Sequence, residues 1–239
     1  MPADITSHES SISSALPVRT RSGRTPAVGA PAWQLCGIVS LESGAPLRVA
    51  DGQLLPFRDL GALVRPTVFA PVAAEQTDVA AYRAVVEGAF ASRSVVPAPF
   101  GTVFRSRESL LRWLELHYFT LEDALRYLQE RQAARVRITP GLAVQGWDTI
   151  EHKVREADLE VTAFDSFRVI RRAAAAFFPV AVQGRKTEEG AEAAFLVDRD
   201  QWQAFLSAVK EEQRRLPDLR FEQTGPWPPY DFVRLELNG

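Results

Sequence analysis

The sequence predicts an α+β protein in which two docked domains, each a sheet layered with helices, follow a disordered tail. Apolar runs of strand length alternate with longer stretches whose apolar residues recur every three or four positions, which favours this class. The second half adds a fuller pattern, because its expected elements follow in the order β-α-β-β-α-β, as in ferredoxin-like domains. We place the tail at residues 1–31, an N-terminal α+β domain at 32–134 and the ferredoxin-like domain at 135–239.

The predicted tail, Met1 to Pro31, is rich in Ser, Thr, Pro and Arg and contains no aromatic residue. Such a segment buries too little apolar surface to offset the entropy lost on ordering, so it is predicted to be disordered. It lacks the continuous apolar core of a secretory signal, and its acidic residues Asp4 and Glu9 are atypical of a transit peptide. A docking role for the tail is the alternative.

Ordered structure is expected to begin at Trp33, where a mostly apolar run of strand length starts. The elements expected in this half are strands at Trp33–Ser40 and Leu60–Val68, a helix from Thr77 to Phe90, an extended segment at Val95–Phe104, and two helices capped by Ser106 and Thr120. These Ser and Thr residues are predicted N-caps because their side-chain oxygens can accept hydrogen bonds from the first helical N–H groups. Pro66 is expected to end the second strand or to leave it at a sheet edge.

The second half continues with the same alternation of apolar runs of strand length and stretches whose apolar residues recur every three or four positions. Its expected elements are a strand at Arg135–Thr139, a helical region at Thr149–Phe178 with a break near Asp158, a strand opening at Val180, a hairpin loop at Gly184–Gly190, a strand at Ala193–Val197, a helix capped by Asp198, and a strand at Leu219–Thr224. The helices of a ferredoxin-like unit pack on one face of its sheet, so the other face needs cover from another domain or a partner. No flexible linker separates the halves, which predicts that they dock.

Composition excludes several classes of function. The net charge of −2 lacks the positive surplus of a nucleic-acid-binding surface. No apolar run reaches the roughly 18–20 residues that span a bilayer. The single cysteine, Cys36, cannot form an internal disulfide, and its apolar neighbours predict a buried thiol. We therefore expect a cytoplasmic protein with no nucleic-acid partner and no membrane partner.

The residue types that carry catalysis do not assemble into a pattern typical of a site. The three histidines, His8, His117 and His152, have no metal-like partner at zinc-site spacing. Phosphate-binding glycine loops and nucleophile elbows are absent as well. Asp198 and Asp200 resemble a metal pair, but acidic residues at a helix start more simply serve as caps and dipole partners. No catalytic, cofactor or metal site is predicted, and we expect no enzyme.

The stretch Gly225–Val233 holds three prolines and three aromatic residues in the sequence GPWPPYDFV. Proline fixes φ and removes a backbone donor, so this segment is stiff and holds large apolar groups at low entropic cost. It follows a predicted strand, and Asp231–Leu237 alternates like another, so we interpret it as a rigid aromatic connector. Two interpretations stay open, since Trp227 and Tyr230 either cover their own core or contact a partner.

The segment Thr224–Val233 closely resembles the C-terminal signature of the GvpF/GvpL family of gas vesicle proteins. Two further blocks are similar to that family in order and spacing, namely Val95–Phe104 (VVPAPFGTVF) and Ala193–Asp200 (AAFLVDRD). The resemblance covers roughly Trp33 to Leu237, and three ordered blocks are more specific than one short motif. It also implies the ferredoxin-like architecture of the second half.

The resemblance implies a non-enzymatic accessory or minor structural protein of gas vesicle assembly, located at the gas vesicle in the cytoplasm. It implies two kinds of partner, the small hydrophobic shell protein and other gas vesicle accessory proteins. On this hypothesis Trp227, Tyr230 and Phe232 contact the partner, while Phe100 and Phe104 line the seam between the halves. A stiff aromatic platform suits this task because it covers apolar surface at low entropic cost.

Two other functions stay open. One is a divergent homologue that serves another protein assembly, since Ala98 and Pro99 stand where the family commonly has a larger apolar residue and Arg. The region between Pro140 and Phe178 is also shorter than the helical hairpin common in the family. The other is a small-molecule-binding ferredoxin-like protein, because that fold hosts many functions, although the sequence offers no candidate set of polar cleft residues.

Overall fold

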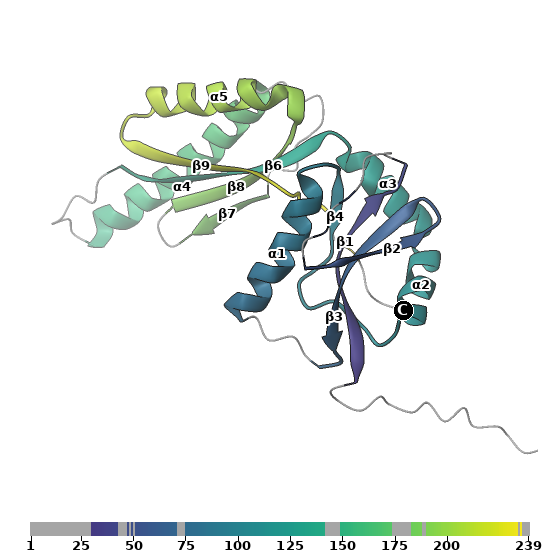
Figure 1. The fold of residues 1–239 in the computed structure, drawn as a ribbon. Helices are drawn as coiled ribbons and strands as arrows, with labels where there is room; N and C mark the ends of the chain where they lie inside the picture. The colour runs from purple at the N-terminus through teal and green to yellow at the C-terminus, as the bar shows by residue number, and fades with distance from the viewer. Residues whose placement is uncertain are drawn as a thin grey trace, which may run out of the picture.

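The computed structural model of the chain describes residues 30–42, 47, 49, 51–70, 75–141, 149–173, 183–187, 190–233 and 235. These residues form two β-sheets and five α-helices, which confirms the predicted α+β class. The sheets lie beside each other, and strand β9 leads the chain from one to the other (Figure 1). Most of the predicted tail lies outside the described residues, and its last residue, Pro31, opens the first strand.

The N-terminal sheet is built around β1, which lies between β3 and two short strands. Its strand order is β2-β3-β1-β4, with β5 also paired to β1, and every pair is antiparallel. The strands are β1 Pro31–Ser40, β2 Gln53–Phe57, β3 Leu60–Val68, β4 Val95–Pro97 and β5 Val103–Phe104. Most of β1 is buried because it is the central strand.

Helices cover both faces of this sheet, and a register shift in β1 decides which residues each face receives. The helices are α1 Gln76–Phe90, α2 Arg107–Leu116 and α3 Tyr118–Leu128. The pairing of β1 with β3 shifts between Leu35 and Gly37, as at a β-bulge, which breaks the period of two along the strand. Leu35 and Ile38 therefore pack in one core cluster with α2 and α3, whereas Cys36 and Val39 pack in a second cluster with α1.

The C-terminal sheet has the strand order β7-β8-β6-β9 and is again antiparallel throughout. Its elements are, along the chain, β6 Arg131–Pro140, α4 Thr149–Ala173, β7 Gln183–Thr187, β8 Gly190–Asp198, the short 3-10 helix η1 Arg199–Gln201, α5 Trp202–Arg215 and β9 Leu219–Trp227. Phe195 of β8 meets Phe167 of α4 and Phe205 of α5, with ring centroids 6.0 Å and 5.3 Å apart. Both helices therefore pack on the same face of the sheet.

The other face of the C-terminal sheet carries charged side chains in the part that the structure describes. Arg135, Arg137 and Glu192 alternate along β6 and β8 with buried apolar residues. The Arg135 guanidinium lies 4.0 Å from the Glu192 carboxylate. Asp231, which follows β9, also pairs with Arg135, so the chain beyond β9 covers one end of this face.

Several strand predictions need correction. β6 begins at Arg131 rather than Arg135, and β9 continues past Thr224 to Trp227. Proline is tolerated in β9 because this is the edge strand, where a missing N–H costs no ladder hydrogen bond. The strand predicted at 231–237 is wrong for its described part, where the chain turns instead.

Two more differences concern the hairpins. β7 occupies most of the loop predicted at 184–190, so the polar hairpin loop is shorter than expected. β2 was not predicted, since it has only five residues and Pro56 weakens its strand signal. Pro66 fits its expected edge position, because β2 pairs with β3 only as far as Val64 and leaves the rest of β3 open on that side.

The predicted helix caps are right in one case and wrong in two. Ser106 caps α2 as expected, and its hydroxyl accepts from the Ser109 N–H at 3.1 Å. Glu75 rather than Thr77 precedes α1, which starts at Gln76. Thr120 lies inside α3, because that helix begins at Tyr118 directly after α2 ends.

The Asp198 prediction is right in position only, because Asp198 stands at the N-cap of η1 but its side chain makes no capping hydrogen bond. Its carboxylate instead accepts from the Arg131 Nε at 3.0 Å, and η1 leads directly into α5. α4 runs through Asp158 without the predicted break. The predicted end of that helix at 174–178 and the strand opening at 180–182 lie outside the described residues. None of the described helices is both long enough and apolar enough to cross a membrane.

Candidate functional site

The aromatic connector, Gly225–Val233, joins the edge of the C-terminal sheet to the N-terminal half. It begins inside β9, where Gly225 adopts a φ of 125°, a conformation that favours glycine. A Cβ at this position would stand 2.8 Å from the carbonyl oxygen of Ala133, so glycine also permits the close approach of β9 to β6. Beyond Trp227, the buried Pro228 and Pro229 lead the chain toward α1.

Tyr230 is the connector residue that docks on the N-terminal half. Its ring centroid lies 6.4 Å from that of Tyr82 in α1, and Tyr82 meets Phe100 edge-on at 5.5 Å. The Tyr82 hydroxyl donates to the carbonyl oxygen of Ala98, which fixes the orientation of this ring. Burial raises the pKa of Tyr230 and of Tyr82, so both phenols are neutral at physiological pH. Tyr82 and Phe100 therefore form an apolar seat for Tyr230.

Asp231 ties the connector to the C-terminal sheet through a bidentate ion pair. The Arg135 Nη2 lies 2.9 Å from Oδ2 and 3.2 Å from Oδ1, and its Nε lies 3.3 Å from Oδ2. This fork geometry is that of strong arginine–carboxylate pairs, although both side chains remain partly exposed. Phe232, Val233 and Leu235 then pack in the large core cluster, which contains residues of both sheets. The connector thus contacts both halves of the molecule.

Trp227 differs from the other connector aromatics because it packs in neither of the two core clusters. Its indole N–H donates to the Thr224 hydroxyl at 3.2 Å. The Arg83 guanidinium lies 5.9 Å from the centre of its ring, within the range of a cation–π contact. The side chain is half-buried, so part of the indole stays open to solvent.

The structure brings together only part of the aromatic set predicted from the sequence. Phe100 joins Tyr230 through their shared neighbour Tyr82. Phe104 lies elsewhere, with its ring 5.6 Å from that of Trp113 in α2. Phe104 therefore takes no part in the seat around Tyr230.

An exposed apolar corner between α2 and α3 was missed by the sequence reasoning. Leu116 is 72% exposed and Phe119 is 75% exposed, although both side chains are large and apolar. They flank His117, where one helix ends and the next begins, so the turn carries them off the buried stripe. Tyr118 donates to Asp59 and packs edge-on against Phe119 at 5.3 Å, which braces the corner. No sequence signal marks it, because helical spacing continues across the break.

The described residues offer neither a metal-binding group nor a reactive thiol. None of the His, Cys, Asp and Glu side chains there forms a group of three or more that could hold a metal ion. Burial raises the pKa of the Cys36 thiol to about 12, so this thiol is protonated and unreactive at neutral pH. The predicted burial of Cys36 is confirmed. The described arrangement is suited to packing and binding.

Sequence comparisons link the chain to gas vesicle proteins. The family model described as gas vesicle synthesis protein GvpL/GvpF matches residues 40–164 and 153–234. Gas vesicle protein F1 of Halobacterium salinarum is 28% identical over 153 residues, which cover 61% of this chain and 62% of that protein, or less than two thirds of its length. Gas vesicle protein F2 of the same organism is 29% identical over 174 residues, which cover 68% of this chain and 72% of that protein.

Two crystal structures of gas vesicle protein GvpF share the fold. The protein from a species of Anabaena aligns with a TM-score of 0.68 and 17% identity, over 87% of this chain and 100% of that one. The protein from Microcystis aeruginosa aligns with a TM-score of 0.65 and 16% identity, over 85% of this chain and 99% of that one. At such low identity the likeness shows the fold alone.

Proposed function

This chain belongs to the GvpL/GvpF family of gas vesicle proteins, and from that premise we propose that it is a non-enzymatic accessory or minor structural protein of gas vesicle assembly. We propose further that it binds the hydrophobic shell protein and other gas vesicle accessory proteins in the cytoplasm. A hydrophobic shell subunit exposes apolar surface before it assembles. A partner that covers this surface needs exposed apolar side chains of its own.

The observation that carries this proposal is the α2–α3 corner. Leu116 and Phe119 expose most of their apolar surface, and covering such surface on binding is favourable. Tyr118 braces Phe119 and is itself held by Asp59, so little side-chain entropy is lost when a partner covers the corner. A small, stiff apolar projection of this kind fits an apolar partner surface.

The aromatic connector supplies the second contact that we propose. Among the three connector aromatics expected to contact a partner and the two expected seam residues, we assign direct contact to Trp227, because its ring packs in neither core cluster. Tyr230 and Phe100 both pack against the core cluster of α1, and Phe232 and Phe104 pack against the large core cluster. We assign these four a supporting role, in which they hold Trp227 and the connector in place.

We also propose that residues 135–239 form a ferredoxin-like domain that docks on an N-terminal domain at 32–134. The described order β6, α4, β7, β8, α5, β9 supports this assignment, and so does the strand order β7-β8-β6-β9. Both helices pack on Phe195 and therefore on one face, as that topology requires. The connector would then supply part of the cover that the opposite face needs.

A pull-down against purified shell protein tests the proposed function. We compare the wild type with Trp227→Ala and with the double variant Leu116→Ser and Phe119→Ser. Val161→Ser is the matched control, because Val161 is a 64% exposed apolar residue on α4, outside both proposed contacts. We expect the double variant and Trp227→Ala to lose binding while they stay folded, with melting temperatures within about 4 °C of the wild type, and the control to bind normally.

Two results would overturn the proposal. One is a folded wild-type protein that does not bind the shell protein at all. The other is a double variant that binds as well as the wild type, which would remove the α2–α3 corner from the contact.

A further inference from the structure

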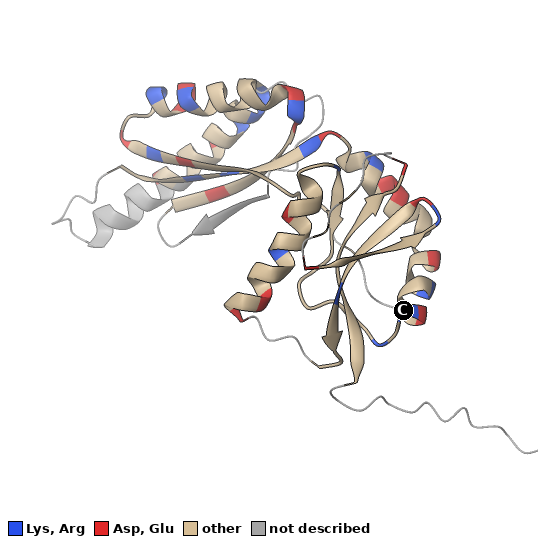
Figure 2. Cartoon of the chain, viewed as in Figure 1, with Lys and Arg blue, Asp and Glu red and all other residues tan. Residues whose placement is uncertain are grey.

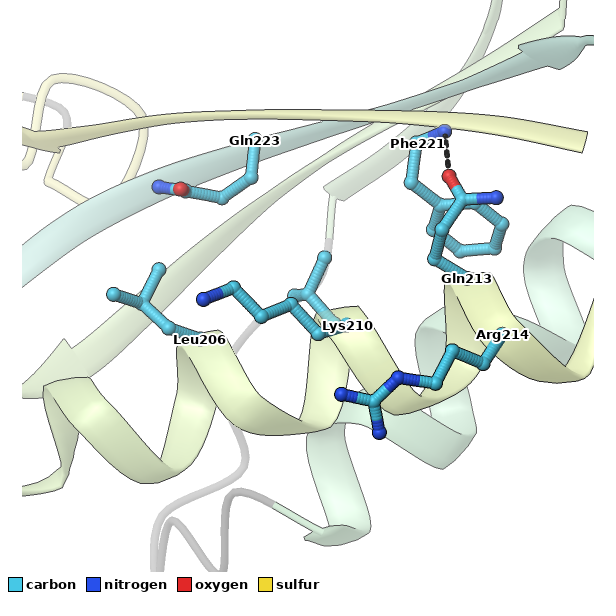
Figure 3. Close-up of a pocket in the computed structure, with 7 residues that line it drawn as sticks. Leu206, Lys210, Gln213, Arg214, Phe221 and Gln223 are labelled. Carbon is cyan, nitrogen blue, oxygen red and sulfur yellow. Dashed lines mark hydrogen bonds between the residues drawn. The ribbon is translucent and has the colours of Figure 1, made fainter.

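A groove of about 420 Å³ lies between α5 and the edge strand β9, on the helix-covered face of the C-terminal sheet (Figure 3). Its residues belong neither to the aromatic connector nor to the α2–α3 corner. The floor is apolar and consists of Leu206 and Val209 from α5 and Phe221 from β9. The groove is therefore a separate surface, and it combines apolar contact with the polar groups described next.

Gln213 closes one end of the groove and fixes its shape. Its side-chain amide bridges the helix to the strand, since Nε2 donates to the Leu219 carbonyl at 2.6 Å and Oε1 accepts from the Phe221 N–H at 2.8 Å. The dashed line in Figure 3 marks the second of these bonds. Because α5 and β9 are tied together at this point, the groove is preformed, and a ligand loses less free energy to rearrangement on binding.

The rim of the groove carries two cations from α5. Lys210 and Arg214 lie one helical turn apart on α5, and both are exposed. The C-terminal half of this helix carries acidic residues as well, because Glu211 and Glu212 stand between Lys210 and Arg214 in the sequence (Figure 2). Neither cation forms an ion pair with a residue that the structure describes, whereas Arg215 pairs with Glu212. None of the described residues that line the groove is acidic, so the lining itself is positively charged.

Gln223 adds a hydrogen-bond donor without an acceptor. Its amide nitrogen is shielded from solvent and has no hydrogen-bond partner in the described part of the chain. A shielded donor of this kind is unfavourable, because its lost hydration is not replaced. Figure 3 shows Lys210 extending along the groove toward Leu206, on the side where Gln223 projects. An oxygen acceptor supplied by a ligand at this end would satisfy both donors.

We propose that this groove binds an acidic segment of a partner protein, in which a carboxylate side chain stands next to an aliphatic one. The carboxylate accepts hydrogen bonds from Lys210 and Gln223 at the open end. A second acidic residue of the segment pairs with the Arg214 guanidinium, which suits a carboxylate geometrically. The aliphatic side chain lies on the floor formed by Leu206 and Phe221.

An extended peptide matches this groove better than a small molecule does. Small-ligand sites bury most of their ligand, whereas Lys210 and Arg214 are exposed and leave this groove open along its rim. From Leu206 to Arg214 the helix rises roughly 12 Å, which is the length of about four residues of extended chain. The inference goes beyond the shell-protein proposal and does not rest on it, because that contact is apolar and lies on other surfaces.

An NMR titration of the full-length, ¹⁵N-labelled chain tests the inference without any shell protein. The probe is the capped peptide Ac-Ala-Leu-Glu-Val-Glu-Ala-NH₂, and a second peptide carries Gln in place of both Glu residues. We expect the acidic peptide to shift the signals of Lys210, Arg214 and Gln223 saturably and to bind more weakly as salt increases. The Gln peptide and sodium hexanoate, a small aliphatic carboxylate, should each bind about tenfold more weakly or worse.

The double variant Lys210→Gln and Arg214→Gln should weaken peptide binding about tenfold or more, since it removes both cations. Arg112→Gln with Arg126→Gln is the matched control, because it removes the same charge from exposed positions on α2 and α3 and should bind normally. The inference is overturned if the acidic peptide shifts no groove signal, if hexanoate or the Gln peptide binds as tightly, or if the double variant binds like the wild type. The comparison of the probes on the wild type decides the question even if a variant loses its fold.

Discussion

Tyr230→Ala is the most direct test of whether the aromatic connector holds the two halves of the molecule together. The substitution removes the ring that packs on Tyr82 and leaves the seat formed with Phe100 uncovered. It does not touch the ion pair between Asp231 and Arg135, so the second attachment of the connector stays in place. Any loss of stability therefore reports the docking of this one ring.

The expected magnitude follows from the burial of the ring. Truncating a fully buried aromatic residue to alanine lowers the free energy of unfolding by about 3–5 kcal/mol. Tyr230 keeps part of its surface in solvent, so we expect a loss of about 2–4 kcal/mol. In a protein of this size each kcal/mol lowers the melting temperature by about 2–4 °C, which gives a drop of roughly 5–15 °C.

Urea unfolding and calorimetry measure the free energy and the melting temperature separately. Tyr230→Phe is the matched control, because it keeps the ring and its packing and should change the free energy of unfolding by less than about 1 kcal/mol. Trp227→Ala provides a second comparison within the connector. The Trp227 ring packs in neither core cluster, so the substitution removes mainly its contact with Arg83. The free energy of unfolding is expected to fall by about 0.5–1 kcal/mol.

Two results would refute this reasoning. If Tyr230→Ala leaves the melting temperature unchanged, the seat on Tyr82 does not stabilise the fold, and Tyr230 is available for a partner instead. If Trp227→Ala destabilises the protein as much as Tyr230→Ala does, Trp227 is a core residue, and its assignment as a contact residue is wrong.

The other predictions concern one ion pair, one buried carboxylate and one thiol. Asp231→Asn leaves the Arg135 guanidinium without its carboxylate and should cost about 1 kcal/mol in urea unfolding, because the pair is partly exposed; a loss above about 3 kcal/mol would indicate a buried pair instead. The hydrogen bond from Arg215 lowers the pKa of Glu212, so the stabilisation by this carboxylate is complete above the usual carboxyl pKa and is lost as pH falls through the lowered native pKa. Glu212→Gln should therefore cost about 1.5–3 kcal/mol at neutral pH and nothing in strong acid, where melts of variant and wild type should converge. Cys36 should resist a thiol reagent in the native protein and react after unfolding in urea; rapid native labelling would contradict its burial.

The fold class was predictable because both backbone periods are visible in the sequence. Errors arose where an element depends on its place in the sheet. β9 runs through Pro226 because none of the described strands pairs with its outer edge. The order of strands in a sheet is not visible in the local sequence around a proline. β2 carries a weak signal for another reason, since it has only five residues and Pro56 interrupts its apolar run, so its pairing with β3 decides that it is a strand.

Helix starts show the same limit of local rules. Ser106 caps α2 because its partner, Ser109, is three residues away, so the whole motif lies in one short stretch of sequence. Asp198 has the same local features, but its carboxylate pairs with Arg131, which lies 67 positions earlier in the chain. Capping was predictable only where no distant partner competed for the side chain.

The sequence predicts that the aromatic connector is stiff, but it does not predict which residues the connector contacts. Prolines and aromatic residues identify the connector, whereas the seat of Tyr230 is formed by Tyr82 and Phe100, which come from distant parts of the sequence. The exposure of Leu116 and Phe119 depends on the turn between two helices and on how both pack against the sheet. Sequence spacing predicts which side chains share a helix face, but it does not predict which faces the fold leaves open.

The three sequence blocks that resemble the GvpF/GvpL family contribute mainly to packing in this structure. Val96 lies in the large core cluster with Phe195, and Tyr230 packs on the α1 cluster, so each block helps to build one of the two cores. Trp227 is the exception, because its ring packs in neither core. Family membership therefore constrains the architecture more closely than it constrains the partners. If partner choice resides in the α2–α3 corner and in the groove between α5 and β9, changes on these surfaces should alter binding without altering the fold, whereas changes at buried positions of the blocks should lower stability first.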